Sequence, residues 1–383
     1  MKELELYLHI PFCERKCAYC DFLSAPADPP VRISYIKKLQ EEIAYYGAQF
    51  EEYQVSSIFF GGGTPTILEG YQLAAILETV KKHFHLAADA EITVECNPGT
   101  LTAGKVEKLV QAGFNRLSMG LQSADDRELQ LLGRIHNFAQ FLESYDLARK
   151  AGFENINVDL MSALPGQTLK SWQSTLQKVT ALRPEHISAY SLIIEEGTPF
   201  YERFAEDEQI REEGGHPRLL PEEEAERQMY ELTEVFLHTK GYERYEISNY
   251  AKPGYECRHN CGYWTRKDYL GLGLGASSFV EHQRFQNTSD LKEYLEQEYH
   301  HIHIETLDKK SEMEEFMFLG LRLMAGVSRQ QFEKTFQVTL DSVYGEVLRK
   351  LKGEQLIEEV AGYVRLTEHG IDVSNYVLSE FLL

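Results

Sequence analysis

Residues 13–20 read CERKCAYC and hold three of the chain's six cysteines, at spacings of four and three. They directly follow LELYLHI (residues 4–10), a run that predicts a β-strand. Structural zinc sites close four ligands and ferredoxin-type clusters take four thiolates, whereas this run offers three. The pattern therefore predicts a [4Fe-4S] cluster held by Cys13, Cys17 and Cys20, with one iron left open. The alternative is a zinc knuckle completed by a distant His or Cys.

An open iron can be chelated by a small molecule with an amino and a carboxylate group. S-adenosylmethionine (SAM) has both, and its sulfonium would then lie where a reduced cluster can donate an electron, with a 5′-deoxyadenosyl radical as the expected product. The CxxxCxxC spacing resembles the signature of radical SAM proteins.

Strand-like and helical patterns alternate between residues 4 and 194. The strand-like runs lie at residues 4–10, 55–60, 91–95, 114–120, 156–161 and 186–194. Between them, residues 34–47, 101–113 and 168–182 have helical periodicity, with polar starts or glycine ends that mark caps. These βα units predict an α/β fold, an open (β/α)6 barrel of the radical SAM kind. A doubly wound open sheet would give the same alternation, so periodicity leaves both architectures open.

Three regions are expected along the chain: a barrel at 1–210, a middle region at 211–305 with a linker and long helix, and a C-terminal domain at 306–383. Glycine and proline predict a polar linker near 205–221, and the amphipathic helix after it should end at Gly241. From about residue 310, three helical stretches and a hairpin-like pair resemble a winged helix. Because this segment lacks a basic stripe, a helical packing module without nucleic acid is favoured.

The overall charge and the cysteine distribution narrow the class of protein. Lys and Arg total 39 against 60 Asp and Glu, a net charge of -21, which argues against nucleic acid as the main partner. No uncharged apolar stretch approaches the ~18 residues of a membrane span, so we expect a cytoplasmic protein. The uneven cysteine spacing is not that of a secreted disulfide framework and favours reduced thiols that bind metal.

Polar residues stand at the ends of successive predicted strands, where function gathers in barrels of this kind. GGGTPT (residues 61–66) follows the second strand, and Glu95 ends the third. Gln122 follows the fourth strand, and Asp159 lies at the end of the fifth. Each could alone be a turn-forming or capping side chain. Their recurrence after four strands predicts a binding site.

Nearly the full chain resembles the oxygen-independent coproporphyrinogen oxidase (HemN) family and, within it, a branch of heme chaperones. The residues that carry the resemblance are Tyr7, CERKCAYCDF, GGGTPT, ECNPGT, SMGLQS, GRIHN, NVDLMSALPGQT, HNCGYW and LTEHG. The resemblance implies that Tyr7 and Tyr19 flank the cluster and SAM. It also implies SAM contacts for Gly62, Gly63, Thr64, Glu95, Gln122, Arg134 and Asp159.

Three features favour the chaperone branch. Phe22 stands where the oxidases carry a fourth cysteine, and the first strand begins at about residue 4, without the oxidases' long N-terminal extension. HNCGYW matches a motif associated with heme binding, which implies His259, Tyr263 and Trp264 as heme residues. A neutral imidazole is a common ligand of heme iron, and aromatic rings offer flat apolar faces to a porphyrin. The thiols on either side, Cys257 and Cys261, leave zinc or heme-thiolate binding as an alternative.

The resemblance thus implies a radical SAM family heme chaperone that binds heme and a [4Fe-4S] cluster and passes heme to acceptor proteins, including membrane-associated respiratory enzymes. A homodimer is also implied. The alternative is an enzyme that decarboxylates coproporphyrinogen III to protoporphyrinogen IX in a SAM-dependent reaction. Carrying heme is favoured over catalysis.

Overall fold

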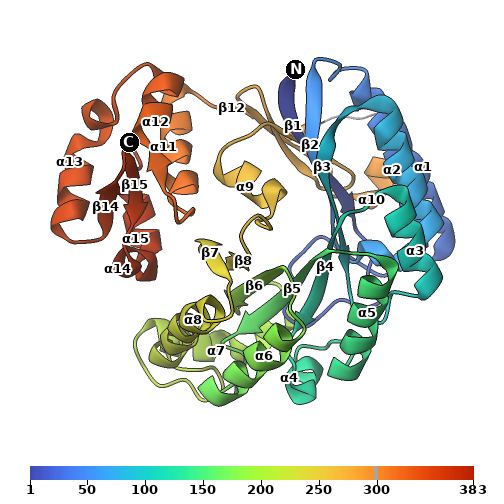
Figure 1. The fold of residues 1–383 in the computed structure, drawn as a ribbon, viewed down its shortest axis with the longest axis horizontal. Coiled ribbons are helices and arrows are strands. Elements are labelled where there is room, and N and C mark those ends of the chain that lie inside the picture. Colours follow the sequence, from blue (N-terminus) through green and yellow to red (C-terminus); the bar gives the residue numbers. More distant parts are fainter. Residues whose placement is uncertain (297–300) are drawn as a thin grey trace.

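The computed structural model describes residues 1–296 and 301–383, and a long curved sheet dominates them (Figure 1). In this described part, twelve strands form one sheet in the order β12-β11-β10-β9-β1-β2-β3-β4-β5-β6-β8-β7. The six central strands are parallel. They are β1 (Lys2–Ile10), β2 (Tyr53–Gly62), β3 (His85–Cys96), β4 (Arg116–Gln122), β5 (Asn155–Ser162) and β6 (His186–Ser191).

Helical connections join these strands and lie on the convex side of the sheet (Figure 1). They are α1 (Pro29–Gly47), the 3-10 turn η1 (Pro65–Ile67), α2 (Gly70–His83), α3 (Ala103–Ala112), α4 (Asp126–Leu131), α5 (Phe138–Ala151) and α6 (Leu169–Ala181). The order of β1 to β6 in space is their order in the chain, without the reversal of a doubly wound sheet. Right-handed crossovers then place the helices that connect β1 to β6 on one face of the sheet. The predicted open (β/α)6 barrel is confirmed.

Side chains of β1 alternate between the two faces of the sheet. Leu4, Leu6 and Leu8 are fully buried in the main core between sheet and helices. Glu5 and Tyr7 have the opposite parity and face the concave side, as expected for a period of two. The inside of the barrel is therefore lined by polar and aromatic groups.

Capping residues stand at the ends of several helices, among them those predicted for residues 101–113. Thr102 accepts the N–H of Lys105 at the start of α3, and Asn137 forms a capping box at the start of α5. Gly113 and Gly152 end these two helices with φ of +101° and +106°, in the left-handed region that glycine tolerates best.

The segment predicted as the middle region continues the same sheet, so the expected barrel boundary at residue 210 does not end it. β9 pairs in parallel with β1, and the remaining added strands pair antiparallel. The elements are α8 (Glu223–His238), β7 (Glu243–Glu246), β8 (Asn249–Ala251), α9 (Arg258–Trp264), β9 (Tyr269–Leu272), β10 (Ser277–Val280), β11 (Gln283–Asn287), α10 (Leu291–Glu296) and β12 (His301–Thr306). α8 is the predicted long amphipathic helix, and α9 lies on the concave side of the sheet (Figure 1).

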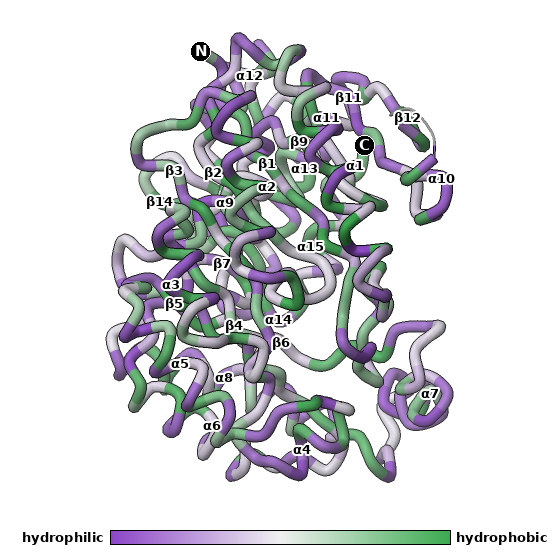
Figure 2. Tube along the Cα trace, turned by 90° about the vertical axis from the view of Figure 1, so that its right-hand side faces the viewer, coloured by the Kyte–Doolittle hydropathy of each residue, from purple (hydrophilic) through white to green (hydrophobic). Residues whose placement is uncertain are grey.

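The linker predicted near 205–221 is wrong in its first half, because helix α7 (Pro199–Glu212) runs through it. Phe200 and Phe204 of α7 are buried in a satellite core, which holds the helix although most of its residues are hydrophilic (Figure 2). The Asp207 carboxylate accepts the N–H groups of residues 218–220 and so folds the following loop back onto the helix. Composition predicted the polar surface but not these tertiary contacts.

The C-terminal domain has a hydrophobic core of its own and the helix and strand order of a winged helix, as predicted. Its elements are α11 (Lys309–Gly320), β13 (Val327–Ser328), α12 (Arg329–Phe336), α13 (Leu340–Gly353), β14 (Ile357–Val360), β15 (Tyr363–Leu366), α14 (Glu368–Asp372) and α15 (Ser374–Ser379). The Met324 N–H donates to the carbonyl of Tyr245 and so ties this domain to β7. Among the described helices, none is long and apolar enough to cross a bilayer.

Candidate cofactor cavity

A cavity of about 270 Å³ lies at the carboxyl ends of the central strands and gathers most of the predicted site residues. These are Cys13, Cys17, Cys20, Tyr19, Gly62, Gly63, Thr64, Glu95, Gln122, Arg134 and Asp159. They come from the loop after β1 and from the ends of strands β2 to β5, together with the segment after α4. The parallel sheet thus brings together residues that are far apart in the sequence.

The cysteine loop is held by backbone hydrogen bonds. The Cys13 N–H donates to the carbonyl of Ala25, and the Ala18 N–H donates to the carbonyl of Leu132. All three thiols are free, and the Cys13 Sγ lies 3.5 Å from the hydroxyl of Thr64. In residues 1–296 and 301–383, no three His, Cys, Asp or Glu side chains converge around one metal ion. A cubane binds each cysteine at a different iron, so its ligands need not converge at a point.

Arg134 places a positive charge beside the thiols. Its Nη1 lies 3.6 Å from the Cys17 Sγ, and its Nη2 donates to Asn97 Oδ1 and to the carbonyl of Gly120, each at 2.5 Å. Burial disfavours a free cation, but the guanidinium stays protonated at any working pH. A fixed cation here can pair with the carboxylate of an amino-acid ligand.

Two carboxyl groups face the cavity from neighbouring strands. Burial, and then repulsion from Asp159, raises the pKa of Glu95 to about 8. The Gly62 N–H donates to Glu95 Oε2 at 3.2 Å, while Asp159 accepts hydrogen bonds from Ser118 and Asn157. Burial also raises the pKa of Asp159. Such a pair can accept hydrogen bonds from the hydroxyl or amino groups of a polar ligand.

Because of this raised pKa, the contribution of Glu95 to the free energy of unfolding depends on pH. Its folded pKa of about 8 lies above the ordinary value of 4.5, so the folded state binds the proton more tightly. The resulting stabilisation is complete below about pH 4.5 and is lost, at about 1.4 kcal/mol per pH unit, as the pH rises from about 4.5 to about 8. Glu95→Gln is therefore expected to raise the melting temperature at pH 8 but not at pH 5. Thermal unfolding of Glu107→Gln, on the exposed face of α3, is the matched control. Equal effects at both pH values would contradict the assignment.

The glycines after β2 allow the cysteine loop to approach closely. Gly62 has φ +109°, and a Cβ on it would collide with the ring of His9. A Cβ on Gly63 would lie 2.7 Å from the carbonyl oxygen of Phe12. The N–H groups of Gly63 and Thr64 donate to carbonyls of the segment that leads into the cysteines, at 2.9 and 2.8 Å. This end of β2 therefore positions the cysteine loop.

Some residues of the cavity were not predicted, and one predicted residue lies outside it. Asn97 and Tyr190 line the cavity: Asn97 Nδ2 donates to the Thr64 hydroxyl, and the Tyr190 hydroxyl donates to Gln122 Oε1. Their positions after β3 and at the end of β6 follow the same strand-end rule and could have indicated them. Tyr7 does not line the cavity; its hydroxyl lies 3.0 Å from His9 Nδ1.

The predicted heme residues lie on α9, apart from the cavity. His259 is only 1% exposed, and its ring stacks on Phe59 with centroids 5.2 Å apart. His259 Nδ1 lies 2.8 Å from the hydroxyl of Ser57, and Nε2 lies 2.9 Å from the hydroxyl of Tyr263. Burial lowers the pKa of His259 to about 3, so the imidazole is neutral. The guanidinium carbon of Arg322 lies 4.5 Å above the centroid of the Trp264 ring.

Helix α9 is seated on two buried carboxyl groups of the sheet. Glu91 accepts the N–H groups of Arg258 and His259 in the first turn of the helix. Glu5 is 1% exposed and lies so close to Gly262 that any Cβ there would collide with its carboxylate. Burial raises the pKa of Glu5 to about 8, and neither of its oxygens has a hydrogen-bond partner among the described residues.

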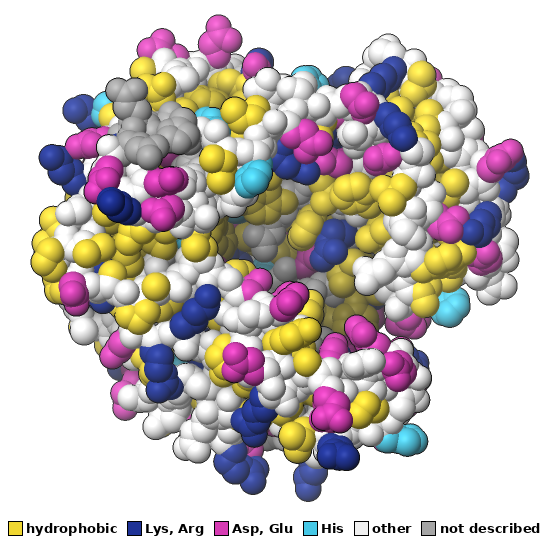
Figure 3. All heavy atoms as spheres, turned by 180° about the vertical axis from the view of Figure 1, so that it is seen from behind, with side chains coloured by type: hydrophobic (Ala, Val, Ile, Leu, Met, Phe, Trp, Pro, Cys, Tyr) yellow, Lys and Arg dark blue, Asp and Glu magenta, His cyan; other side chains and the backbone are white. Residues whose placement is uncertain are grey.

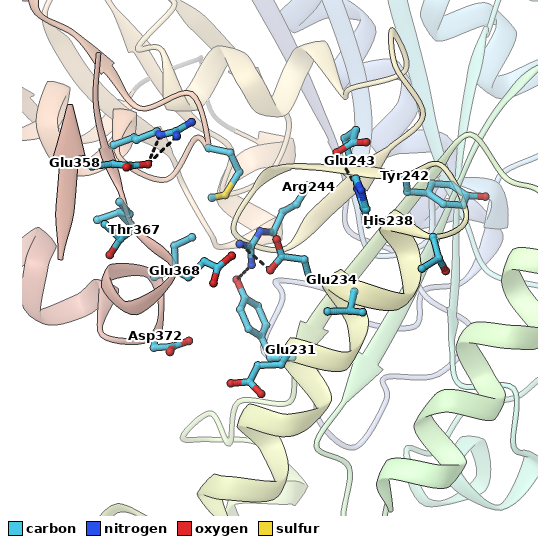
Figure 4. Close-up of a pocket in the computed structure, with 17 residues that line it drawn as sticks. Glu231, Glu234, His238, Tyr242, Glu243, Arg244, Glu358, Thr367, Glu368 and Asp372 are labelled. Atoms are coloured by element: carbon cyan, nitrogen blue, oxygen red, sulfur yellow. Dashed lines mark hydrogen bonds and ion pairs between the residues drawn. The ribbon is translucent and has the colours of Figure 1, made fainter. Parts of the chain in front are cut away.

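A larger cavity, of about 820 Å³, separates α8 and β7 from the C-terminal domain (Figure 4). Carboxylates from both sides point into it, among them Glu234 and Glu358. Arg244 pairs with Glu234 at 2.9 Å, and Arg365 pairs with Glu358 at 2.7 Å. The predicted site residues all lie elsewhere. The cavity is a polar cleft between two parts of the molecule.

Comparison with known proteins gives matches along nearly the whole chain. The radical SAM superfamily model matches residues 7–179, and the HemN C-terminal domain model matches residues 307–373. The heme chaperone HemW of Bacillus subtilis is 38% identical, with 98% of both chains covered. That of Escherichia coli is 36% identical, with 99% of this chain and 98% of the other covered. The solved structure of coproporphyrinogen III oxidase (HemN) from Escherichia coli has a TM-score of 0.84 at 24% identity, covers 100% of this chain and 90% of its own, and shows the shared fold.

A cysteine triad after the first strand of an open (β/α)6 barrel, together with these matches, defines a radical SAM protein, a class whose cofactors are a [4Fe-4S] cluster and SAM. Within that class, the chain is 36–38% identical to HemW heme chaperones along nearly its full length and 24% identical to the HemN oxidase. The chain belongs to the HemW family.

Proposed function

We propose that this protein is a heme chaperone: it binds heme and a [4Fe-4S] cluster and transfers heme to acceptor proteins. The observation that carries the proposal is a neutral histidine in an aromatic setting on α9, within the HNCGYW motif. Phe22 supports it, because a 63% exposed phenyl ring lines the cofactor cavity where the oxidases carry a fourth cysteine. The names of the HemW relatives agree with this role.

Within the cavity, we assign Cys13, Cys17 and Cys20 to the cluster. We assign to SAM the cavity residues Tyr19, Gly62, Gly63, Thr64, Glu95, Gln122, Arg134 and Asp159. Tyr7 is assigned to SAM on the family resemblance alone, because it does not line the cavity. When bound, the cluster and SAM supply one-electron reduction and cleavage of the sulfonium. The chain's own part is electrostatic and steric: Arg134 offers a cation to the methionine carboxylate, and Glu95 and Asp159 offer acceptors.

Heme is assigned to His259, Tyr263 and Trp264. Both ring nitrogens of His259 are engaged within the protein, so iron can bind only after α9 releases one of them. Figure 3 shows the molecule hollowed at its centre, with hydrophobic side chains on the wall of the hollow. A flat apolar macrocycle suits such a surface.

The partners follow from this role. The acceptors are heme-requiring proteins, membrane-associated respiratory enzymes among them, which this protein serves from the cytoplasm. A homodimer is the proposed assembly of the cluster-loaded form. The net charge of -21 argues against nucleic acid as the main partner.

The test is an anaerobic assay of the reconstituted protein with two arms. One arm titrates heme and then adds an apo acceptor; stoichiometric binding followed by transfer is expected. The other arm supplies coproporphyrinogen III, SAM and a reductant, and no protoporphyrinogen above background is expected. Catalytic turnover in the second arm would overturn the chaperone proposal.

The alternative function is SAM-dependent decarboxylation of coproporphyrinogen III. The observation that favours it is the cavity itself, which retains the cysteine triad, Arg134 and the carboxyl pair Glu95 and Asp159. A chaperone that uses the cofactors for assembly or regulation would also retain these groups, so the two arms of the assay are needed to separate the functions.

A further inference from the structure

A chain of hydrogen bonds crosses the inside of the barrel from α9 to the cofactor cavity. It starts at the N-cap of α9, where the Cys257 N–H lies 3.3 Å from the Tyr245 hydroxyl. That hydroxyl lies 2.8 Å from His186 Nε2, and His186 Nδ1 lies 2.6 Å from Asn157 Oδ1. Asn157 Nδ2 donates to Asp159 Oδ1 at 2.7 Å, and Asp159 lines the cavity.

Donor and acceptor chemistry gives this chain one direction. Asn157 Nδ2 can only donate, so its Oδ1 must accept from Nδ1–H of His186. The neutral imidazole then accepts at Nε2 from the hydroxyl of Tyr245, whose oxygen accepts the Cys257 N–H. Every bond points toward the Asp159 carboxylate, and bonds aligned in this way polarise one another. Within the described residues, no side-chain atom of Tyr245, His186 or Asn157 lacks a partner.

Tyr245 lies where three parts of the molecule meet. Its hydroxyl and Glu91 together hold the first turn of α9, the helix that carries His259. Its backbone carbonyl accepts the N–H of Met324 from the C-terminal domain at 3.0 Å. Through His186, on β6, it reaches the strands that form the cavity.

We propose that Tyr245, His186 and Asn157 are positioning residues that couple the cofactor cavity to helix α9, so that SAM bound beside Asp159 changes how firmly α9 and His259 are held against the sheet. The inference rests on the proposed function in taking the cavity as the SAM site. A ligand that hydrogen-bonds to the Asp159 carboxylate competes with the bond from Asn157 to Asp159. A change in that bond alters the other hydrogen bonds of the series. Because linkage is reciprocal, release of α9 must change SAM affinity by the same factor.

Hydrogen exchange of the α9 backbone, measured by mass spectrometry on cluster-reconstituted protein with and without SAM, tests this coupling. In the unaltered protein, saturating SAM is expected to change exchange at residues 257–264 by about fivefold or more. Tyr245→Phe removes one oxygen from the chain, and the effect of SAM on α9 should disappear. The same variant should bind SAM about three- to tenfold more tightly, measured by calorimetry, because the weakened hydrogen bonds compete less for the Asp159 carboxylate.

Tyr242→Phe is the matched control. Tyr242 is 2% exposed, and its hydroxyl donates to the carbonyl of Pro184 at 2.7 Å. This bond is not part of the series of hydrogen bonds from α9 to Asp159. It should lose comparable stability and yet keep the response of α9 to SAM. A merely structural role of Tyr245 would make the two variants alike.

Each result has a separate meaning. If SAM leaves exchange in α9 unchanged in the unaltered protein, or if the response survives Tyr245→Phe, the coupling is wrong. A protein that shows the coupling but binds no heme would overturn the proposed function and leave the inference standing. Heme binding without any response of α9 to SAM would overturn the coupling and leave the proposed function standing.

Discussion

Replacing Cys17 by serine is expected to abolish the iron–sulfur cluster. With three cysteine ligands and no fourth thiolate in the motif, the loss of one leaves two thiolates, and a serine oxygen is a poor substitute for a soft ligand. The Cys17 sulfur also accepts a hydrogen bond from the Arg134 guanidinium at 3.6 Å. After anaerobic reconstitution, iron and sulfide contents and the thiolate-to-iron absorption band should fall to background.

The control for this result is Cys261→Ser. Cys261 is a partly buried free cysteine on α9, and with Cys257 it forms the other thiol pair that could bind metal. Iron and sulfide contents of this variant should equal those of the unaltered protein. A full cluster in Cys17→Ser, or a lost cluster in Cys261→Ser, would contradict the assignment of the cluster to the cavity and would favour a metal site on α9.

The second large effect concerns heme. His259→Ala is expected to weaken heme binding at least tenfold, which corresponds to about 1.4 kcal/mol, because the imidazole is the proposed iron ligand. Heme titration followed by absorbance gives both the affinity and the ligation state of the iron. His303→Ala, at an exposed histidine of β12, is the control and should bind heme normally.

Tyr263→Phe tests the same assignment in the opposite direction. It leaves the proposed ligand His259 in place and removes the hydroxyl that competes with iron for its Nε2. The Tyr263 hydroxyl occupies His259 Nε2 at 2.9 Å, so its removal frees that nitrogen while keeping the aromatic ring. A net hydrogen bond of roughly 1 kcal/mol implies about fivefold tighter heme binding. Heme binding that is unchanged in both variants would remove His259 as the ligand.

Much of the fold and most of the cofactor cavity could be predicted from the sequence. The strand-end rule and the cysteine spacing found Glu95, Gln122 and Asp159, because parallel strands end at one edge whatever the details of packing. Periodicity alone could not separate a barrel from a doubly wound sheet, since both have the same order of elements along the chain. Spatial order depends on which strands pair, and β1 to β6 pair in sequence.

The setting of the heme motif was beyond sequence reasoning. HNCGYW shows a histidine among aromatic residues, but the groups that engage it, Ser57 and Tyr263, belong to β2 and to α9 itself. Burial against Phe59 is a tertiary property that no local pattern encodes. Strand β8 was also not predicted, because it has only three residues and a run so short has no recognisable period.

The pairing of β1 with β9 joins residues 5–8 to residues 269–272, and it has a consequence for biosynthesis. One edge of β1 stays unpaired until more than 260 further residues have been added. At about 5–20 residues per second, translation takes on the order of ten seconds or more to reach β9. During this time the nascent chain exposes an apolar strand edge, the kind of surface that invites pairing with other chains. The first strand of this protein therefore keeps an unpaired edge for most of the time of its synthesis, until β9 has been made.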